Sequence, residues 1–402
     1  MRGIVCAVLI VTNLQGQGKT DPPALHDPPR FRTGQIEAAT DAGAHSSAGM
    51  ANRNTPPLPV HGPAAAGEAV LRRAVREQPG GFGPNLTLGQ FLLEAGRASE
   101  AIPVLRTALR ARPNDTAARH DLAVALIETA KLDEARSLLT ALQQETKAAG
   151  IVNLEARWLA ASGQALPAAN LFQRAAETEP SERHLFDWGN HLLSHGAAEP
   201  AVKIFRYASD RFPRSARLKI ALGVAHYAQG EFDAAVRSVC EGVDLNPQDL
   251  RPLVFLGQMV DVSSQWNQQL SQKLERFAKL YPSNAQAQYF YGLSLAQNAR
   301  AAEPYLRRAA TLDPGYAEPR LALGKIYADA GRDAEAIREL EAALRLSLDS
   351  DAAHYRLGQL YQRAGNPERS LQHFAEYRRL KAARVEREEQ ERKQRQRLSE
   401  KQ

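Results

Sequence analysis

Small residues recur at a fixed spacing among large apolar residues along most of this chain. In the segment LALGKIYADAGRDAEAIRELEAALRL, residues 321–346, the apolar residues follow each other at intervals of three and four, which is the spacing of an apolar stripe on a helix. Gly331 interrupts the stripe and can adopt the left-handed conformation that ends a helix, and Asp333 can cap the next helix. The pattern therefore predicts two helices joined by a tight turn.

The same helical hairpin returns about every 34 residues, which indicates an internal repeat. Helices of about 15 residues or fewer are marginal alone in water, so the hairpins must pack against one another. We expect repeats to begin at about residues 82, 116, 149, 182, 216, 250, 285, 317 and 351. The small residue of the first helix in each repeat is Gly89, Ala123, Ala156, Gly189, Gly223, Gly257, Gly292, Gly324 and Gly358.

Two repeats depart from this pattern. In the sixth, Gln269 and Leu270 stand where alanine is expected, and the seventh is shorter by about two residues between its helices. We expect these two repeats to be the least regular.

The repeated pattern resembles that of the tetratricopeptide-repeat (TPR) family. Besides the small residue of the first helix, the resemblance rests on two alanines of the second helix and on a closing proline. The alanines are Ala101, Ala135, Ala168, Ala201, Ala235, Ala302 and Ala336, followed by Ala108, Ala175, Ala208, Ala309 and Ala343, and the prolines are Pro113, Pro180, Pro213, Pro247, Pro282 and Pro314. The resemblance covers about residues 82–384 and implies an all-α, right-handed α-solenoid of about nine helix-turn-helix repeats.

The N-terminal residues differ in composition from the repeats. Residues 1–20 carry Arg2 and a short apolar run, which is typical of a secretory signal peptide, and 21–66 are rich in Pro, Ala and Gly, as in a disordered linker. A helix from Glu68 to Gln78, within a segment 67–81, should cap the solenoid. We expect a bacterial, exported protein in the periplasm or outside the cell, with the cytoplasm as the alternative.

The C-terminal end is strongly charged. Residues 378–402 contain ten Lys or Arg and five Glu, and so supply +5 of the formal net charge of +6. Residues 385–402 are predicted to form a charged helical tail beyond the repeats. The near-neutral repeats argue against nucleic acid as a ligand, whereas contact between the basic tail and an anionic membrane stays an alternative to a plain solvated tail.

No motif in the sequence predicts catalysis, a cofactor or a metal. GQGKT at residues 16–20 lacks the first glycine and the strand-helix context of a phosphate-binding loop. His184, Asp187, His191 and His195 fall near one helix face, where His191 and His195 could share a metal ion, but a polar stripe is the preferred interpretation because no further ligand or second shell can be named. Cys240 is interpreted as a small apolar residue of a second helix.

The TPR resemblance implies that positions 2, 5, 9 and 12 of each first helix face a concave groove. These positions give three arginines, Arg183, Arg217 and Arg251, together with a mainly apolar set: Phe186, Asn190, Ile220, Tyr227, Tyr289, Leu321 and Tyr355. Exposed aromatic residues beside arginine are common at interaction hot spots. Either the arginine stems only cover neighbouring turns, or the arginines form a ladder that holds carboxylates of a ligand.

The resemblance thus implies a non-catalytic scaffold that binds a peptide or partner helix of unknown identity in the concave groove. The alternative is a subunit of a bacterial envelope, secretion or pilus assembly complex tethered near a membrane. The oligomeric state does not follow from the sequence.

Overall fold

The computed structural model describes residues 63–247, 249, 251–260, 267–346 and 350–399. In this part of the chain every regular element is a helix, and no strand occurs. The chain divides into two units, one ending at Pro252 and the other beginning at Leu253, which are described separately. The signal-like segment 1–20 and residues 21–62 of the predicted linker lie outside the described residues.

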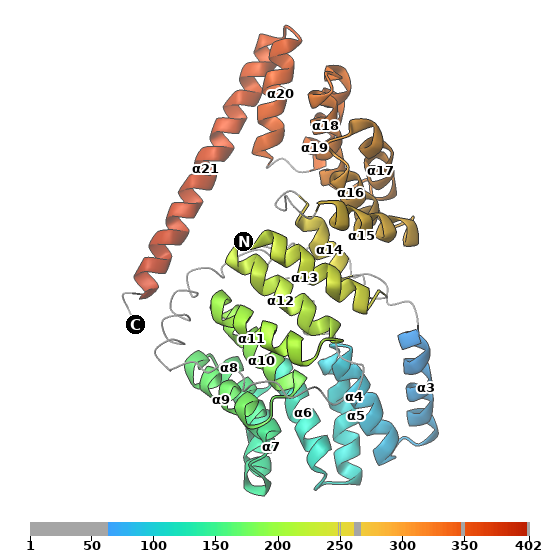
Figure 1. Cartoon of the computed structure of the whole chain (residues 1–402), viewed down its shortest axis with the longest axis vertical. Coiled ribbons are helices and arrows are strands. Elements are labelled where there is room, and N and C mark those ends of the chain that lie inside the picture. Colours follow the sequence, from blue (N-terminus) through green and yellow to red (C-terminus); the bar gives the residue numbers. More distant parts are fainter. Residues whose placement is uncertain (1–62, 248, 250, 261–266, 347–349, 400–402) are drawn as a thin grey trace. The chain divides into compact units, whose positions relative to one another are not determined.

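The N-terminal unit consists of one helix followed by five helix pairs (Figure 1). The single helix is α3 (Pro63–Glu77). The pairs are α4 (Phe82–Glu94) with α5 (Ala98–Ala111), α6 (Thr116–Glu128) with α7 (Leu132–Glu145), α8 (Ala149–Ala161) with α9 (Ala165–Thr178), α10 (Glu182–Ser194) with α11 (Ala198–Arg211), and α12 (Ala216–Gln229) with α13 (Phe232–Leu245).

The second unit continues the pairing. Its helices are α14 (Arg251–Gln258), whose first two residues belong to the N-terminal unit, α15 (Asn267–Leu280), α16 (Ala285–Ser294), α17 (Ala299–Leu312), α18 (Ala317–Asp329), α19 (Asp333–Leu346), α20 (Asp351–Arg363) and α21 (Pro367–Ser399). Each helix of the described chain packs mainly on its neighbours in sequence, so the predicted all-α solenoid is confirmed.

The two helices of a repeat meet where the first helix carries glycine. A Cβ atom on Gly324 would lie 2.5 Å from Cγ of Leu340, and one on Gly89 would lie 2.5 Å from Cδ2 of Leu105. A Cβ atom on Gly189 would likewise lie 2.7 Å from Cε1 of Phe205. These distances leave no room for a side chain, so the small residues are needed for the close approach of the helices.

The turn between the paired helices follows the prediction in part. Gly331 has a φ of 73°, the left-handed conformation expected of it. Asp333 is not the cap of the following helix, because it is the first residue of α19 and its carboxylate instead accepts hydrogen bonds from Arg363 of α20 at 2.8 and 3.0 Å. Side-chain caps occur at other helix starts, as at Ser215 before α12, which accepts from the backbone N–H of Leu218, and at Asn298 before α17, which accepts from that of Ala301.

The two repeats expected to be irregular are so. The sixth repeat has a first helix, α14, of only eight residues, and the space beside Gly257 is filled by Phe290 of the next repeat. In the seventh repeat, Leu306 packs against Gly292 and follows it in the sequence by 14 residues. The same spacing is 16 residues in the eighth repeat, where Leu340 packs against Gly324. The first helix of the seventh repeat, α16, is correspondingly short at 10 residues.

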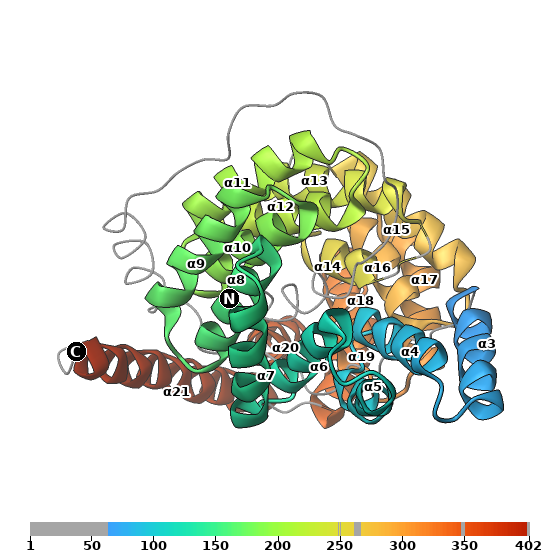
Figure 2. The same ribbon diagram turned by 90° about the horizontal axis from the view of Figure 1, so that it is seen from below.

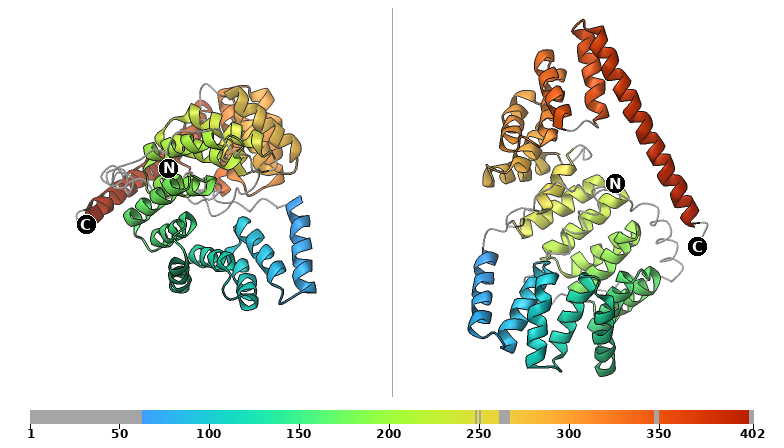
Figure 3. Two further views of the ribbon diagram at one scale, coloured as in Figure 1. Left: turned by 60° about the horizontal axis from the view of Figure 1, so that its bottom comes forward. Right: turned by 180° about the vertical axis from the view of Figure 1, so that it is seen from behind.

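The two ends of the array differ from its middle. Helix α3 begins at Pro63, earlier than the predicted start at Glu68. Glu68 of α3 forms an ion pair with Arg97, and Glu303 of the second helix α17 forms the equivalent ion pair with Arg332. Helix α3 therefore takes the place of a second helix whose own first helix is not among the described elements. At the other end α21 runs for 33 residues, well past its partner α20 (Figures 1 and 3). Among the described residues no helix is both long and apolar enough to cross a bilayer.

The helix crossing gives a direct test. Changing Gly324 to Ala should lower the stability of the second unit by roughly 1–3 kcal/mol, because Leu340 is 1% exposed and cannot move aside freely. The midpoint of urea unfolding, followed by circular dichroism, measures this. Gly150→Ala is the matched control, since nothing lies within 4 Å of a Cβ there and no loss is expected. Equal effects of the two changes would contradict the packing argument.

Candidate functional site

The candidate site lies on three first helices of the N-terminal unit, α8, α10 and α12. Within this unit α8 and α10 follow the inner side of the curve, and their partners α9 and α11 follow its outer side (Figure 2). The predicted groove residues of this unit lie on α10 and α12, except for Arg251 at the start of α14. We call the three helices the inner face.

Arg217 at the start of α12 is the centre of the inner face. Its guanidinium carbon lies 3.3 Å above the ring centroid of Phe186 on α10, a close cation–π contact. Arg217 is only 7% exposed, and its Nε has no hydrogen-bond partner within the described residues. A buried guanidinium with an unpaired donor is costly, so this atom marks a place where an acceptor would be favourable.

The surroundings of Arg217 do not neutralise it by direct pairing. Burial lowers the pKa of Arg217 to about 10, and the carboxylates of Asp187 and Glu182 act in the opposite direction. Both carboxylates are engaged elsewhere: Asp187 accepts from Asn153 Nδ2 at 2.7 Å, and Glu182 accepts from Ser215 Oγ at 2.7 Å. Arg217 therefore stays charged at neutral pH and shares its environment with a second cation, Arg183.

Asn153 on α8 is the second buried polar group of the inner face. It is 3% exposed and donates to Asp187 of the next repeat, but its Oδ1 has no partner in the described residues. It occupies the helix position that holds Phe186 and Ile220 in the following repeats, and the sequence analysis did not single it out. The inner face thus offers one unpaired acceptor, Asn153 Oδ1, and one unpaired donor, Arg217 Nε, on either side of Asp187.

The apolar part of the predicted groove is mostly core. Phe186 and Ile220 are each 1% exposed, so the expectation that they line an open surface is wrong. Phe186 packs on Phe205 of α11 and is covered by Arg217, and Ile220 fills the space beside Gly242 of α13. Asn190 and Arg183 are half-buried, and so is Tyr227, whose ring meets Phe232 edge-on at 5.4 Å.

The remaining predicted residues do not join this site. Arg251 is bound by Asp249, with Nε and Nη2 each 2.8 Å from a carboxylate oxygen. The other three belong to the second unit: Leu321 packs at the edge of its core, Tyr289 meets Tyr316, and Tyr355, 42% exposed, lies beside Tyr377. The three arginines therefore have different environments, and an even ladder of free guanidinium groups is not what the structure contains.

The histidines of α10 act as structural groups. His184 Nδ1 lies 2.8 Å from the carbonyl of Glu179, and His191 Nε2 lies 2.9 Å from the carbonyl of Ala165. The rings of His191 and His195 are 4.3 Å apart. Among the described residues no group of three or more His, Cys, Asp or Glu could hold a metal ion.

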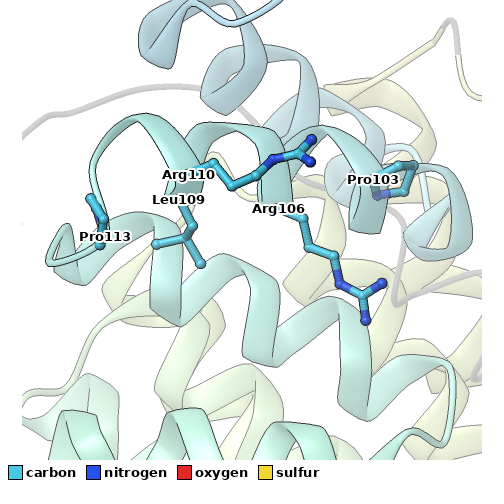
Figure 4. Close-up of a pocket in the computed structure, with 5 residues that line it drawn as sticks. All are labelled: Pro103, Arg106, Leu109, Arg110 and Pro113. Carbon is cyan, nitrogen blue, oxygen red and sulfur yellow. The ribbon is translucent and has the colours of Figure 1, made fainter.

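A shallow pocket of about 710 Å³ lies on α5, away from the inner face (Figure 4). It is lined by Pro103, Arg106, Leu109, Arg110 and Pro113. Arg106 pairs with Glu134 of α7, and Arg110 donates to Thr107 at 2.9 Å. Because both guanidinium groups already have partners, we assign no binding role to this pocket.

Consecutive helix pairs that cross at small residues define the protein as a helical-repeat protein. Residues 92–158 and 186–249 each match a family model described as tetratricopeptide repeat, and residues 324–365 match one described as TPR repeat. These matches support the resemblance to tetratricopeptide repeats that the sequence pattern indicated.

Solved structures and curated proteins were also compared with the chain. A crystal structure of MamA is 23% identical, with a TM-score of 0.36, and the match covers 41% of this chain and 97% of that one. YrrB, described as a TPR protein with an unusual peptide-binding site, is 16% identical, with a TM-score of 0.30. That match covers 46% of this chain and 97% of the YrrB chain. Scores this low carry no functional argument. No curated protein matched the chain.

The buried histidine of α10 gives a pH prediction. Burial, together with His195, lowers the pKa of His191 from 6.5 to about 4. The unfolded chain therefore takes up a proton between pH 6.5 and 4 that the folded chain does not, and stability should fall as the pH drops through this range. His191→Gln, which keeps a donor for the Ala165 carbonyl, should remove roughly 3 kcal/mol of that pH dependence.

Thermal unfolding midpoints of both proteins between pH 7 and 4 test this expectation. His184→Gln is the control, because it removes another buried imidazole of α10 that contacts a backbone carbonyl. Parallel pH profiles for the His191 variant and the unchanged protein would show that His191 does not titrate as the structure indicates.

Proposed function

We propose that the protein is a non-catalytic scaffold that binds an extended peptide segment bearing a carboxylate on the inner face of its N-terminal unit. What supports this is one observation: Asn153 Oδ1 and Arg217 Nε are buried, polar and without a hydrogen-bond partner in the described residues, although Asn153 Nδ2 donates to Asp187 and the charge of Asp187 acts on Arg217. Tetratricopeptide repeats serve as protein-interaction modules, so a site on a first helix agrees with the class.

The chemistry of a peptide meets both requirements. A peptide group carries an N–H that can donate to Asn153 Oδ1 and a C=O that can accept from Arg217. A carboxylate near Arg183 and Arg217 would add charge-assisted hydrogen bonds of roughly 1.5–3 kcal/mol. The ligand would restore hydrogen bonds to groups that now have none, which is a larger gain than adding contacts to a satisfied surface.

The alternative role in an envelope, secretion or pilus assembly complex stays a prediction. It depends on export, and residues 1–20 lie outside the described residues. Immunodetection of the chain in periplasmic and cytoplasmic fractions tests export, and a cytoplasmic chain that retains Met1 would exclude it.

The partner can be captured at the site by photo-crosslinking. A benzoylphenylalanine at Asn190, on the inner face, should crosslink to a partner in the native host, and mass spectrometry identifies it. The same group at Arg206, exposed on the outer helix α11, is the control. Equal crosslinking at both positions would move the binding surface away from the inner face.

With that partner in hand, Arg217→Met should weaken binding by at least about tenfold, or roughly 1.4 kcal/mol. Methionine keeps an apolar cover over Phe186 but removes the donors and the charge, so loss of affinity is separated from loss of folding. Arg206→Ala is expected to leave the affinity unchanged. Calorimetric titration measures both, and a folded Arg217→Met variant of normal affinity would refute the role of Arg217.

A further inference from the structure

Two histidines face each other in the last repeat. His354 on α20 and His373 on α21 have their Nδ1 atoms 3.0 Å apart, with ring centroids 5.2 Å apart. Both residues are half-buried, so the pair can be reached from solvent. This pair lies in the second unit and is independent of the inner face.

The preceding repeat shows what these two positions ordinarily do. Thirty-four residues earlier, the same positions hold Arg320 and Glu339, whose Nη1 and Oε2 atoms form an ion pair at 3.1 Å between α18 and α19. The backbone therefore brings the two side chains together in both repeats. In the last repeat the bridging pair consists of two imidazoles, which cannot attract each other as opposite charges do.

The distance between the two nitrogens suits a shared metal ion. Imidazole nitrogens bind zinc at about 2.0–2.1 Å, so two of them on one ion lie roughly 2.9 Å apart at a right angle and roughly 3.3 Å apart in a tetrahedron. The observed 3.0 Å falls within this range. Because the ring centroids are only 5.2 Å apart, the two Nδ1 atoms point at each other, so an ion bound to both lies beside the line that joins them and the His354 ring has to turn toward it.

The orientation of His373 is fixed by its neighbours. Its ring stacks on Tyr361, with an angle of 7° between the planes and 5.6 Å between the centroids. The Tyr361 hydroxyl in turn donates to Glu341 and accepts from Arg369. A ligand ring that is held in place loses little freedom on binding a metal, and outer groups of this kind commonly orient ligating histidines.

We propose that His354 and His373 bind a divalent transition-metal ion through their two Nδ1 atoms, so that the ion links α20 to α21. Imidazole ligands favour Cu²⁺, Ni²⁺ and Zn²⁺ over Mg²⁺, which prefers oxygen. Water completes the coordination, in keeping with the absence of a group of three ligating side chains in the described part of the chain. On binding, the ring that donates the present Nδ1–H bond moves this proton to Nε2.

The experiment is calorimetric titration of the untagged full chain with Ni²⁺ and Zn²⁺, and with Mg²⁺ as the ion that should not bind. We expect one saturable site, and at least tenfold weaker binding in His354→Gln and in His373→Gln. His195→Gln removes one histidine of the neighbouring pair His191 and His195. This variant should bind Ni²⁺ as tightly as the unchanged chain does. Saturating Ni²⁺ should also raise the unfolding temperature of the unchanged chain but not of the two variants.

A double variant separates folding from binding. His354→Arg with His373→Glu recreates the pair found at Arg320 and Glu339, so it should fold normally and yet lose the site. Absence of saturable binding to the unchanged chain would overturn the proposal. So would binding that survives in the double variant or is lost in His195→Gln.

Discussion

Every regular repeat of this protein depends on one contact, in which a large side chain of the second helix presses against a glycine or alanine of the first. Leu340 against Gly324 and Phe205 against Gly189 are examples. Helices of this length are not stable alone, so they depend on packing against each other, and this contact sets how closely they approach. Where it is replaced, the repeat changes: Gly257 faces Phe290 of the next repeat, and its own helix is the shortest described.

This constraint explains why the fold could be predicted and the site could not. The small size of Gly and Ala is a property of the residue type. Their spacing in the sequence therefore reveals the helix pairs, their turns and even the shortened seventh repeat. Exposure on a helix face is different, because it depends on how a neighbouring side chain lies. Phe186 was expected to be open, but Arg217 of the next repeat lies across it. The capping role expected of Asp333 failed for a similar reason, since Arg363 competes for its carboxylate.

Charged side chains connect the repeats at their turns. Arg332 binds Glu335 of its own repeat and Glu303 of the preceding one, and it also lies 4.2 Å from the ring centroid of Tyr327. Arg97 binds Glu100 and Glu68 in the same arrangement. Ion pairs near the surface add little stability singly. These pairs show the register of the repeats, because each arginine joins the same two helix positions, which identifies α3 as a second helix of the repeat pattern.

The unpaired groups of the inner face have to be weighed against this background of satisfied contacts. Leaving a buried donor or acceptor without a partner costs roughly 1–3 kcal/mol, and Arg217 Nε and Asn153 Oδ1 are two such atoms. Asp187 accepts a hydrogen bond from Nδ2 of Asn153. Its carboxylate has no donor group, so it cannot pair with Asn153 Oδ1, which is also an acceptor. Arg217 Nε and Asn153 Oδ1 therefore lower the stability of the N-terminal unit, and the ligand proposed above, which supplies an N–H and a C=O, would recover that loss on binding.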